Sequence, residues 1–221
     1  MRIAVIPARA NSKGIPGKNL KQVGNYSLVA RAIRAAVECG GFDLIAVSTD
    51  GAEIAEEAER HGARVVIRPD TISQDHSRTI DAVEHLLQSL NITMGTCVLL
   101  QPTSPLRNAE DIREALEIWE RQQQGSVVAV SECEHHPYKM LISEGGTLLP
   151  VHTMSDLEAP RQSLPKACRI NGAIYINRVD DLVAFGTFLH PPLTTYTMPS
   201  ERSIDIDGPL DLKIANILVE S

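Results

Sequence analysis

The chain has 221 residues, of which 43% are apolar and 22% charged, a composition typical of one globular domain and not of a disordered chain. Its 21 lysines and arginines are outnumbered by 28 aspartates and glutamates, so the net charge of −7 argues against DNA, RNA or anionic lipid as a partner. An aromatic content of 4% also leaves few side chains to stack on bases. Any anion must therefore be bound by a local cluster of cations.

Elements alternate between short apolar runs and amphipathic stretches, which predicts strands and helices in turn. In chain order we expect a strand at 2–8, a helix at 28–39, a strand at 42–50, a helix at 52–62, a strand at 63–69, a helix from Ser77 to 90, a strand at 96–102, a helix at 109–123 and a strand at 126–132. We expect Ser27 to cap the first helix and Gly40 to end it. This alternation predicts an α/β fold with right-handed crossovers and a mostly parallel sheet.

The alternation stops near Glu132. Residues 133–170 are rich in glycine, proline and polar residues without a helical period, and we expect an inserted arm or a small antiparallel sheet there. Strands at 170–177 and 202–208 and a helix at 209–220 are expected to complete a single domain of residues 1–221.

The cysteines are expected to be buried and reduced, because they form no close pair and no zinc-finger spacing: Cys39, Cys97, Cys133 and Cys168. No apolar run reaches the roughly 18–20 residues that a membrane span needs. The first ten residues are interrupted too soon, by Pro7 and Arg9, to be a secretory signal. We therefore expect a cytoplasmic protein without membrane contact.

The stretch "PARANSKGIPGKN", residues 7–19, follows the first strand and is called the basic loop. It gathers Arg9, Lys13 and Lys18 at the carboxyl end of a strand, where ligands of α/β folds bind. Cations and backbone N–H groups in such a loop favour phosphate binding, although a solvated surface loop is the alternative. It is not a Walker loop, which requires Ser or Thr where Asn19 stands, and no G-x-G-x-x-G is present.

The stretch "SIDIDGPLD" places Asp205 and Asp207 two residues apart. On a strand both carboxylates would point to one face, roughly 6–7 Å apart. Like charges this close favour a cation between them, and Mg²⁺ accepts one or two carboxylates together with phosphate oxygens. A solvent-facing edge strand is the alternative, and Asp211 is expected to interact with the positive end of the last helix. A phosphate loop and an acidic metal pair together indicate nucleotidyl transfer.

Five segments, "PARANSKGIPGKN", "VSTD", "LLQPTSPLR", "RINGAIYI" and "SIDID", have the order and spacing found in the CMP-sialic acid synthetases, or acylneuraminate cytidylyltransferases. The chain resembles this family over essentially its whole length. The resemblance implies a three-layer Rossmann-like nucleotidyltransferase fold with an inserted dimerisation arm at 133–170. It also implies that CTP is joined to a nine-carbon acidic sugar with release of pyrophosphate, with Mg²⁺ as cofactor and a homodimer as the assembly.

The resemblance also implies roles for individual residues. The catalytic residues would be Arg9, Lys13, Lys18 and Asp207. The nucleotide would be bound by Arg9, Ser12, Lys13, Lys18, Asn19, Arg68, Asp75 and Thr79. The sugar would be bound by Gln101, Arg169, Tyr175 and Phe188, with Arg169 facing its carboxylate. The metal ligands would be Asp205 and Asp207, and the arm would send Lys139 and Arg161 into the active site of a second subunit.

Other interpretations stay open. The sugar could be legionaminate or ketodeoxyoctonate, and a non-catalytic nucleotide-binding regulator would share the basic loop. His135 and His136 resemble half of a metal site, but without a third ligand at suitable spacing a structural turn is favoured. Trp119 is expected in the core, and Asp50 is expected to cap the following helix or to border the pocket.

Overall fold

The structure is a computed structural model that describes residues 1–74 and 76–220. Its strands are β1 (Arg2–Pro7), β2 (Gln22–Val23), β3 (Tyr26–Ser27), β4 (Leu44–Thr49), β5 (Arg64–Ile67), β6 (Thr96–Leu99), β7 (Ser126–Glu132), β8 (Leu141–Glu144), β9 (Thr147–Pro150), β10 (Cys168–Arg178) and β11 (Leu193–Thr197). Its α-helices are α1 (Leu28–Cys39), α2 (Ala52–Arg60), α3 (Thr79–Ser89), α4 (Ala109–Gln122), α5 (Met154–Glu158), α6 (Val179–Phe185) and α7 (Pro209–Glu220).

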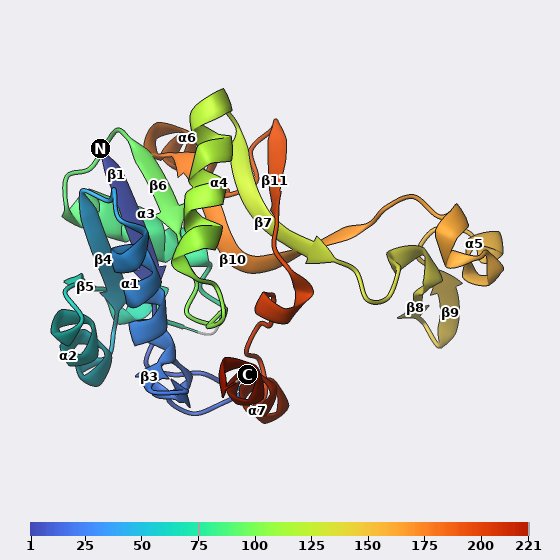
Figure 1. The fold of residues 1–221 in the computed structure, drawn as a ribbon, viewed down its shortest axis with the longest axis horizontal. Coiled ribbons are helices and arrows are strands. Elements are labelled where there is room, and N and C mark those ends of the chain that lie inside the picture. The colour runs from blue at the N-terminus through green and yellow to red at the C-terminus, as the bar shows by residue number, and fades with distance from the viewer. Residues whose placement is uncertain (75, 221) are drawn as a thin grey trace.

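The central sheet has seven strands in the order β11-β7-β10-β6-β1-β4-β5 (Figure 1). All neighbouring strands pair in parallel except at β10, which is antiparallel to both β6 and β7. The expected α/β fold with a mostly parallel sheet is therefore confirmed. Because β1, β4, β5 and β6 are parallel, the loops that follow them meet at one edge of the sheet.

Helices cover both faces of this sheet (Figure 1). Along β1, Ala4 and Ile6 belong to one apolar cluster and Ile3 and Val5 to another, as the strand period of two requires. The first cluster includes residues of α1, α2 and α4, and the second includes residues of α3 and α6. Trp119 of α4 is 3% exposed in the first cluster, so its prediction as a core residue is confirmed.

The ends of α1 follow from local chemistry. Ser27 accepts a hydrogen bond from the N–H of Ala30 at 3.2 Å, which caps the helix as predicted. Gly40 ends it with a φ of 75° and donates its N–H to the carbonyl of Ala36. Ser27 thus sets the point at which α1 begins behind the basic loop, and Gly40 sets the point at which it ends.

Residues 133–167 leave the sheet between β7 and β10 and carry the antiparallel pair β8–β9 and the short α5, apart from the rest of the protein (Figure 1). His136 stabilises the turn at its start, because one ring nitrogen accepts the N–H of Tyr138 and the other lies 2.8 Å from the carbonyl oxygen of Pro165. The described residues hold no cluster of three or more histidines, cysteines or acids suited to a metal. The structural interpretation of His136 is confirmed.

The predicted strand at 202–208 is wrong. Residues 203–207 belong to no strand, and the N–H of Ile206 donates instead to the carbonyl of Thr103 in a loop, at 2.8 Å. Ile206 is buried in a third apolar cluster with Ile15 and Ala215, so the alternation of isoleucine and aspartate reflects packing against the basic loop and α7. Two further elements near the sheet were not predicted: β11 is its edge strand beside β7, and α6 packs in the second apolar cluster.

The four cysteines are free thiols, and Cys97 is buried as expected, which raises its pKa to about 12. The expectation of burial is wrong for Cys168, which is exposed at the start of β10 where the arm returns to the sheet. In the part of the chain that the structure describes, no helix combines the length and the apolar character that crossing a membrane demands.

Candidate active site

The basic loop is held at the carboxyl edge of the sheet by polar contacts at both ends. The N–H of Ala10 donates to Oδ1 of Asp50, the residue after β4, at 2.8 Å. The amide of Asn19, which is 6% exposed, donates to the carbonyl of Arg9 at 2.8 Å. Asp50 does not cap α2, whose N-cap residue is Gly51, and it does not line the cavity described below, but it contacts both the basic loop and Arg68. These bonds fold the loop back on itself, so that its cations face the same space as the next strand ends.

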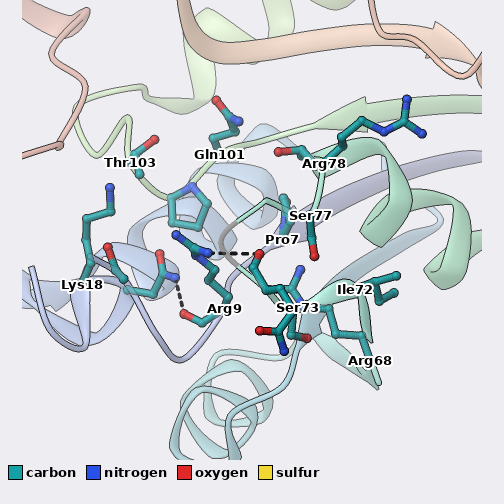
Figure 2. A pocket seen from close by; sticks show the side chains of 15 residues that line it. Pro7, Arg9, Lys18, Arg68, Ile72, Ser73, Ser77, Arg78, Gln101 and Thr103 are labelled. Carbon is teal, nitrogen blue, oxygen red and sulfur yellow. Dashed lines mark hydrogen bonds between the residues drawn. The ribbon is translucent and has the colours of Figure 1, made fainter. Parts of the chain in front are cut away.

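A cavity of about 260 Å³ lies at this edge (Figure 2). Its lining includes seven residues that the resemblance implied: Arg9, Ser12, Lys18, Asn19, Arg68, Thr79 and Gln101. It also includes polar residues that the sequence did not single out: Ser73, Gln74, Ser77, Arg78 and Thr103. Figure 2 shows Lys18 and Arg68 at opposite ends of this view, with Arg9 between them. Together with Arg78, these residues bring four cations to the lining.

Arg68 carries a buried charge in the cavity wall. It follows β5 and is 6% exposed, its Nη2 lies 3.7 Å from Asp50 Oδ1, and its Nε has no partner among the described residues. Burial lowers its pKa, the Asp50 carboxylate opposes that change, and the nearby Arg9 guanidinium lowers the pKa further. A guanidinium stays charged at neutral pH despite such shifts, so Arg9 and Arg68 both bring positive charge to the cavity wall.

The basic loop touches the residues that carry the acid pair, although 188 positions separate Lys18 from Ile206. We call residues 203–208 the acid segment. Lys18 Nζ donates to the carbonyl of Ile206 at 2.6 Å and lies 3.6 Å from Oδ1 of Asp207. Gly14 is so close that a Cβ atom added to it would lie 2.2 Å from the Asp207 carbonyl oxygen. Lys18 of the cavity lining is thus brought together with the acid segment, although neither Asp205 nor Asp207 is part of that lining.

The two carboxylates of the acid segment have unlike surroundings. Asp205 Oδ1 is buried and lacks a partner among the described residues, whereas the Asp207 side chain is 82% exposed. Burial raises the pKa of Asp205, a hydrogen bond with Thr103 opposes the rise, and the neighbouring Asp207 charge adds to it. An unpartnered buried carboxylate oxygen beside a second carboxylate fits a site for a divalent cation that takes its other ligands from water and phosphate.

A second cavity of about 300 Å³ shares Arg78, Thr79 and Gln101 with the first. Tyr175 and Phe188 also line it, with ring centroids 5.6 Å apart, so three of the four predicted sugar-binding residues meet here. The remaining space beside Gln101 is tight, because a Cβ on Gly172 would lie 2.7 Å from Gln101 Oε1.

A family model described as Cytidylyltransferase matches residues 3–141, more than half of the chain. The chain is also 37% identical to a CMP-N,N′-diacetyllegionaminic acid synthase of Legionella pneumophila, over 100% of its own length and 97% of that relative. The chain belongs to the cytidylyltransferase family. The resemblance to the CMP-sialic acid synthetases is confirmed at the level of the family.

Two further relatives of this cytidylyltransferase agree. It is 34% identical, over 93% of its length, to an N-acylneuraminate cytidylyltransferase of Streptococcus agalactiae, and it spans 50% of that relative's length. A solved structure of a CMP:2-keto-3-deoxy-manno-octonic acid synthetase, complexed with CTP, matches with a TM-score of 0.73 over 99% of this chain and 98% of that one. At 16% identity this structure shows the shared fold alone.

Several predicted residues of the cytidylyltransferase lie outside both cavity linings. Arg169 is close to the acid segment instead, and its Nη2 donates to the carbonyl of Ser203 at 3.0 Å. Lys13 is exposed on the basic loop. Asp75 lies outside the residues that the structure describes.

Lys139 and Arg161, the two predicted site residues of the arm, form hydrogen bonds within the arm itself. Lys139 Nζ donates to the carbonyl of Leu157 at 3.0 Å, and an Arg161 Nη2 donates to the carbonyl of Cys133 at 2.5 Å. Neither residue lines the cavities of its own chain.

Sequence reasoning overlooked Thr103, although it stands in the quoted segment "LLQPTSPLR". Its side chain binds Asp205, its carbonyl accepts the N–H of Ile206, and it lines the first cavity. A hydroxyl two residues after Gln101, at the carboxyl end of a central strand, was the available signal.

Proposed function

We propose that this cytidylyltransferase transfers CMP from CTP to the anomeric hydroxyl of a nine-carbon acidic sugar and releases pyrophosphate. The contact of Lys18 with the acid segment carries this proposal, because it puts cations for a triphosphate beside carboxylates for a metal. N-acetylneuraminate is the first candidate sugar. N,N′-diacetyllegionaminate is the second, supported by the relative from Legionella pneumophila that matches over 97% of its length.

The triphosphate is proposed to lie along the cationic lining of the first cavity. Arg9 and Lys18 of this lining bind its oxygens, the exposed Lys13 of the same loop reaches them from outside the lining, and Arg68 and Thr79 lie toward the nucleoside. The sugar hydroxyl forms a bond to the α-phosphorus, the bond to the β-phosphate oxygen breaks, and the hydroxyl proton is released to water. Charge grows on the departing pyrophosphate, so fixed cations stabilise this transition state more than the bound substrate.

Asp205 and Asp207 are proposed to hold Mg²⁺, since the orphaned Asp205 oxygen and the open Asp207 carboxylate offer it two ligands. When bound, the ion neutralises phosphate oxygens and lowers the proton affinity of the attacking hydroxyl. Lys18 keeps the pair close to the basic loop, and burial of Asp205 leaves its charge in need of a cation.

The second cavity is proposed to hold the sugar. Gln101 offers an amide to its hydroxyl or acylamido groups, and Tyr175 and Phe188 offer apolar surface to its substituents. Arg169 uses one of its donors on Ser203, which leaves others for the sugar carboxylate. This arrangement orients the sugar from the side of Gln101 toward the acid segment.

Pyrophosphate release tests the function directly. Purified protein, CTP and Mg²⁺ are combined with N-acetylneuraminate, N,N′-diacetyllegionaminate or ketodeoxyoctonate, and kcat/KM is measured for each sugar. We expect pyrophosphate release with a nine-carbon sugar, and we expect the highest kcat/KM for either N-acetylneuraminate or N,N′-diacetyllegionaminate. Release with ketodeoxyoctonate alone would transfer the assignment to that eight-carbon sugar. CTP binding without release for any sugar would favour a nucleotide-binding regulator.

The arm is proposed to join two copies into a homodimer and to place Lys139 and Arg161 in the partner's active site. Its exposed apolar side chains are unusual for a monomer surface: Met140, Leu141, Ile142, Leu148, Leu149, Val151 and Met154. Because the arm lies apart from its own sheet (Figure 1), another copy is the natural cover for these residues.

Mixing two inactive variants tests this role of the arm. One carries Lys18→Met in its own cavity, and the other carries Arg161→Ala in its arm. Hybrid dimers would contain one site with an intact Lys18 and an intact arm from the partner. After subunit exchange we expect about a quarter of wild-type activity, since half of the dimers are hybrids with one working site each. No recovery in exchanged samples would mean that each site is built from one chain.

A further inference from the structure

The acid segment has no strand partner among the described residues, so its position depends on the hydrogen bond from Ile206 to the Thr103 carbonyl and on a few side-chain contacts. The strongest is made by Arg202, the last residue of the 3₁₀ turn that precedes it. Its guanidinium meets the carboxylate of Asp111 in a fork, with Nη2 2.7 Å from Oδ1 and Nε 3.1 Å from Oδ2. A two-point contact of this kind fixes orientation as well as distance.

Asp111 is a rigid support for that contact. It lies in the first turn of α4 and is 0% exposed. Oδ1 also accepts the hydroxyl of Tyr196 on β11 at 2.8 Å, and Oδ2 accepts the N–H of Asn108 at 2.9 Å. The positive end of α4 favours the ionised carboxylate. Since this buried charge would be left unpaired if Arg202 moved, the fork resists displacement.

The constraint passes from Arg202 directly into the acid segment. The next residue, Ser203, is 1% exposed and donates its hydroxyl to the carbonyl of Pro199 at 2.8 Å. Asn171 donates to the same hydroxyl oxygen at 3.0 Å. Asp205 follows two residues later. The acid segment is thus anchored at its start by a buried ion pair and at its far end by the contacts with the basic loop.

We propose that Asp111 is a positioning residue for the acid pair: through Arg202 it holds the acid segment where Asp205 and Asp207 can share one divalent cation. The inference rests on the metal role given to this pair in the proposed function. Neither Asp111 nor Arg202 lines either cavity, so both act at a distance from the substrate. Replacing Asp111 therefore weakens metal binding without removing a metal ligand.

Binding of Mn²⁺ to the full-length protein in the presence of CTP, followed by electron paramagnetic resonance, tests this inference. For Asp111→Asn we expect the Mn²⁺ dissociation constant to rise about tenfold, the lower end of what loss of an outer support costs a metal site. Arg202→Gln breaks the same ion pair by changing its partly exposed partner, and we expect it to raise the Mn²⁺ dissociation constant by a similar factor. This variant replaces Asp111→Asn in the test if Asp111→Asn does not fold. Amide hydrogen exchange at Ile206 and Asp207 should become faster in both variants.

Tyr196→Phe is the matched control, because it removes another hydrogen bond to the same carboxylate and leaves the fork intact. It should lower the melting temperature and leave the Mn²⁺ dissociation constant and the exchange rates unchanged. Lower melting temperatures for Asp111→Asn and Arg202→Gln with wild-type Mn²⁺ binding and exchange would overturn the inference. Asp205→Asn separates the two claims. If it binds Mn²⁺ like the wild type, the proposed metal site is wrong, and the exchange rates alone decide whether Asp111 holds the segment.

Discussion

Lys18→Met is expected to lower kcat by about 10²- to 10³-fold, the usual cost of removing one group that stabilises transition-state charge. Lys18 ties the basic loop to the acid segment, through its contacts with Ile206 and Asp207. Methionine keeps the length and apolar stem of the side chain but cannot neutralise pyrophosphate. Initial rates of pyrophosphate release at saturating CTP and sugar measure the effect.

Lys21→Met provides the control for this substitution. Lys21 carries the same charge three residues away, is exposed, and lines neither cavity. Its loss should leave kcat near the wild-type value. That result would show that the effect of Lys18→Met comes from the position of the Lys18 charge and not from the loss of one positive charge in this region. Equal turnover for Lys18→Met and the wild type would contradict the catalytic role of Lys18.

Gly14→Ala is expected to lower kcat/KM by about 10²-fold, because misplacement of catalytic groups by an ångström has that cost. The added methyl group would lie 2.2 Å from the carbonyl oxygen of Asp207, a backbone atom that cannot rotate away. Either the basic loop or the acid segment must shift, and the cations and carboxylates then separate. Steady-state kinetics with varied CTP, together with a melting curve to confirm folding, measure the outcome.

Gly208→Ala is the matched control within the same segment. A Cβ there would meet nothing closer than Oδ2 of Asp211, at 3.8 Å, which is an ordinary contact. We expect kcat/KM near that of the wild type. If Gly14→Ala also retained wild-type kinetics, close packing of the basic loop on the acid segment would not matter for catalysis.

The strands of the central sheet and the α-helices up to β7 could be predicted because local patterns determine them, whereas the two-residue strands β2 and β3 were missed. Ser27 and Gly40 mark the ends of α1, and apolar runs of the right length mark the parallel strands. Beyond β7 the local signal fails. β11 is a short, threonine-rich strand without an apolar alternation, and it pairs with β7 at the sheet edge. α6 has seven residues, too few for a clear helical period.

The site could be predicted only in part, for the same reason. The basic loop was visible as a cluster of cations, and its chemistry together with that of the acid pair indicated one shared site, but nothing local says that Lys18 meets Asp207. The acid segment has the sequence pattern of a strand because Ile206 is fully buried, whereas Asp205 is half-buried and Asp207 is exposed. Asp111 resembles an ordinary first-turn acid of an amphipathic helix, and its burial arises from Tyr196 and Arg202, far away in the sequence.

Convergence of the basic loop and the acid segment on one triphosphate is the central claim. A crystal structure of the protein with CTP and Mn²⁺ tests it most directly, with the metal located by its anomalous signal. We predict the triphosphate between Arg9 and Lys18 and the metal peak bonded to a carboxylate oxygen of Asp205 or Asp207. A triphosphate bound away from Lys18, or a metal peak apart from both aspartates, would contradict the claim.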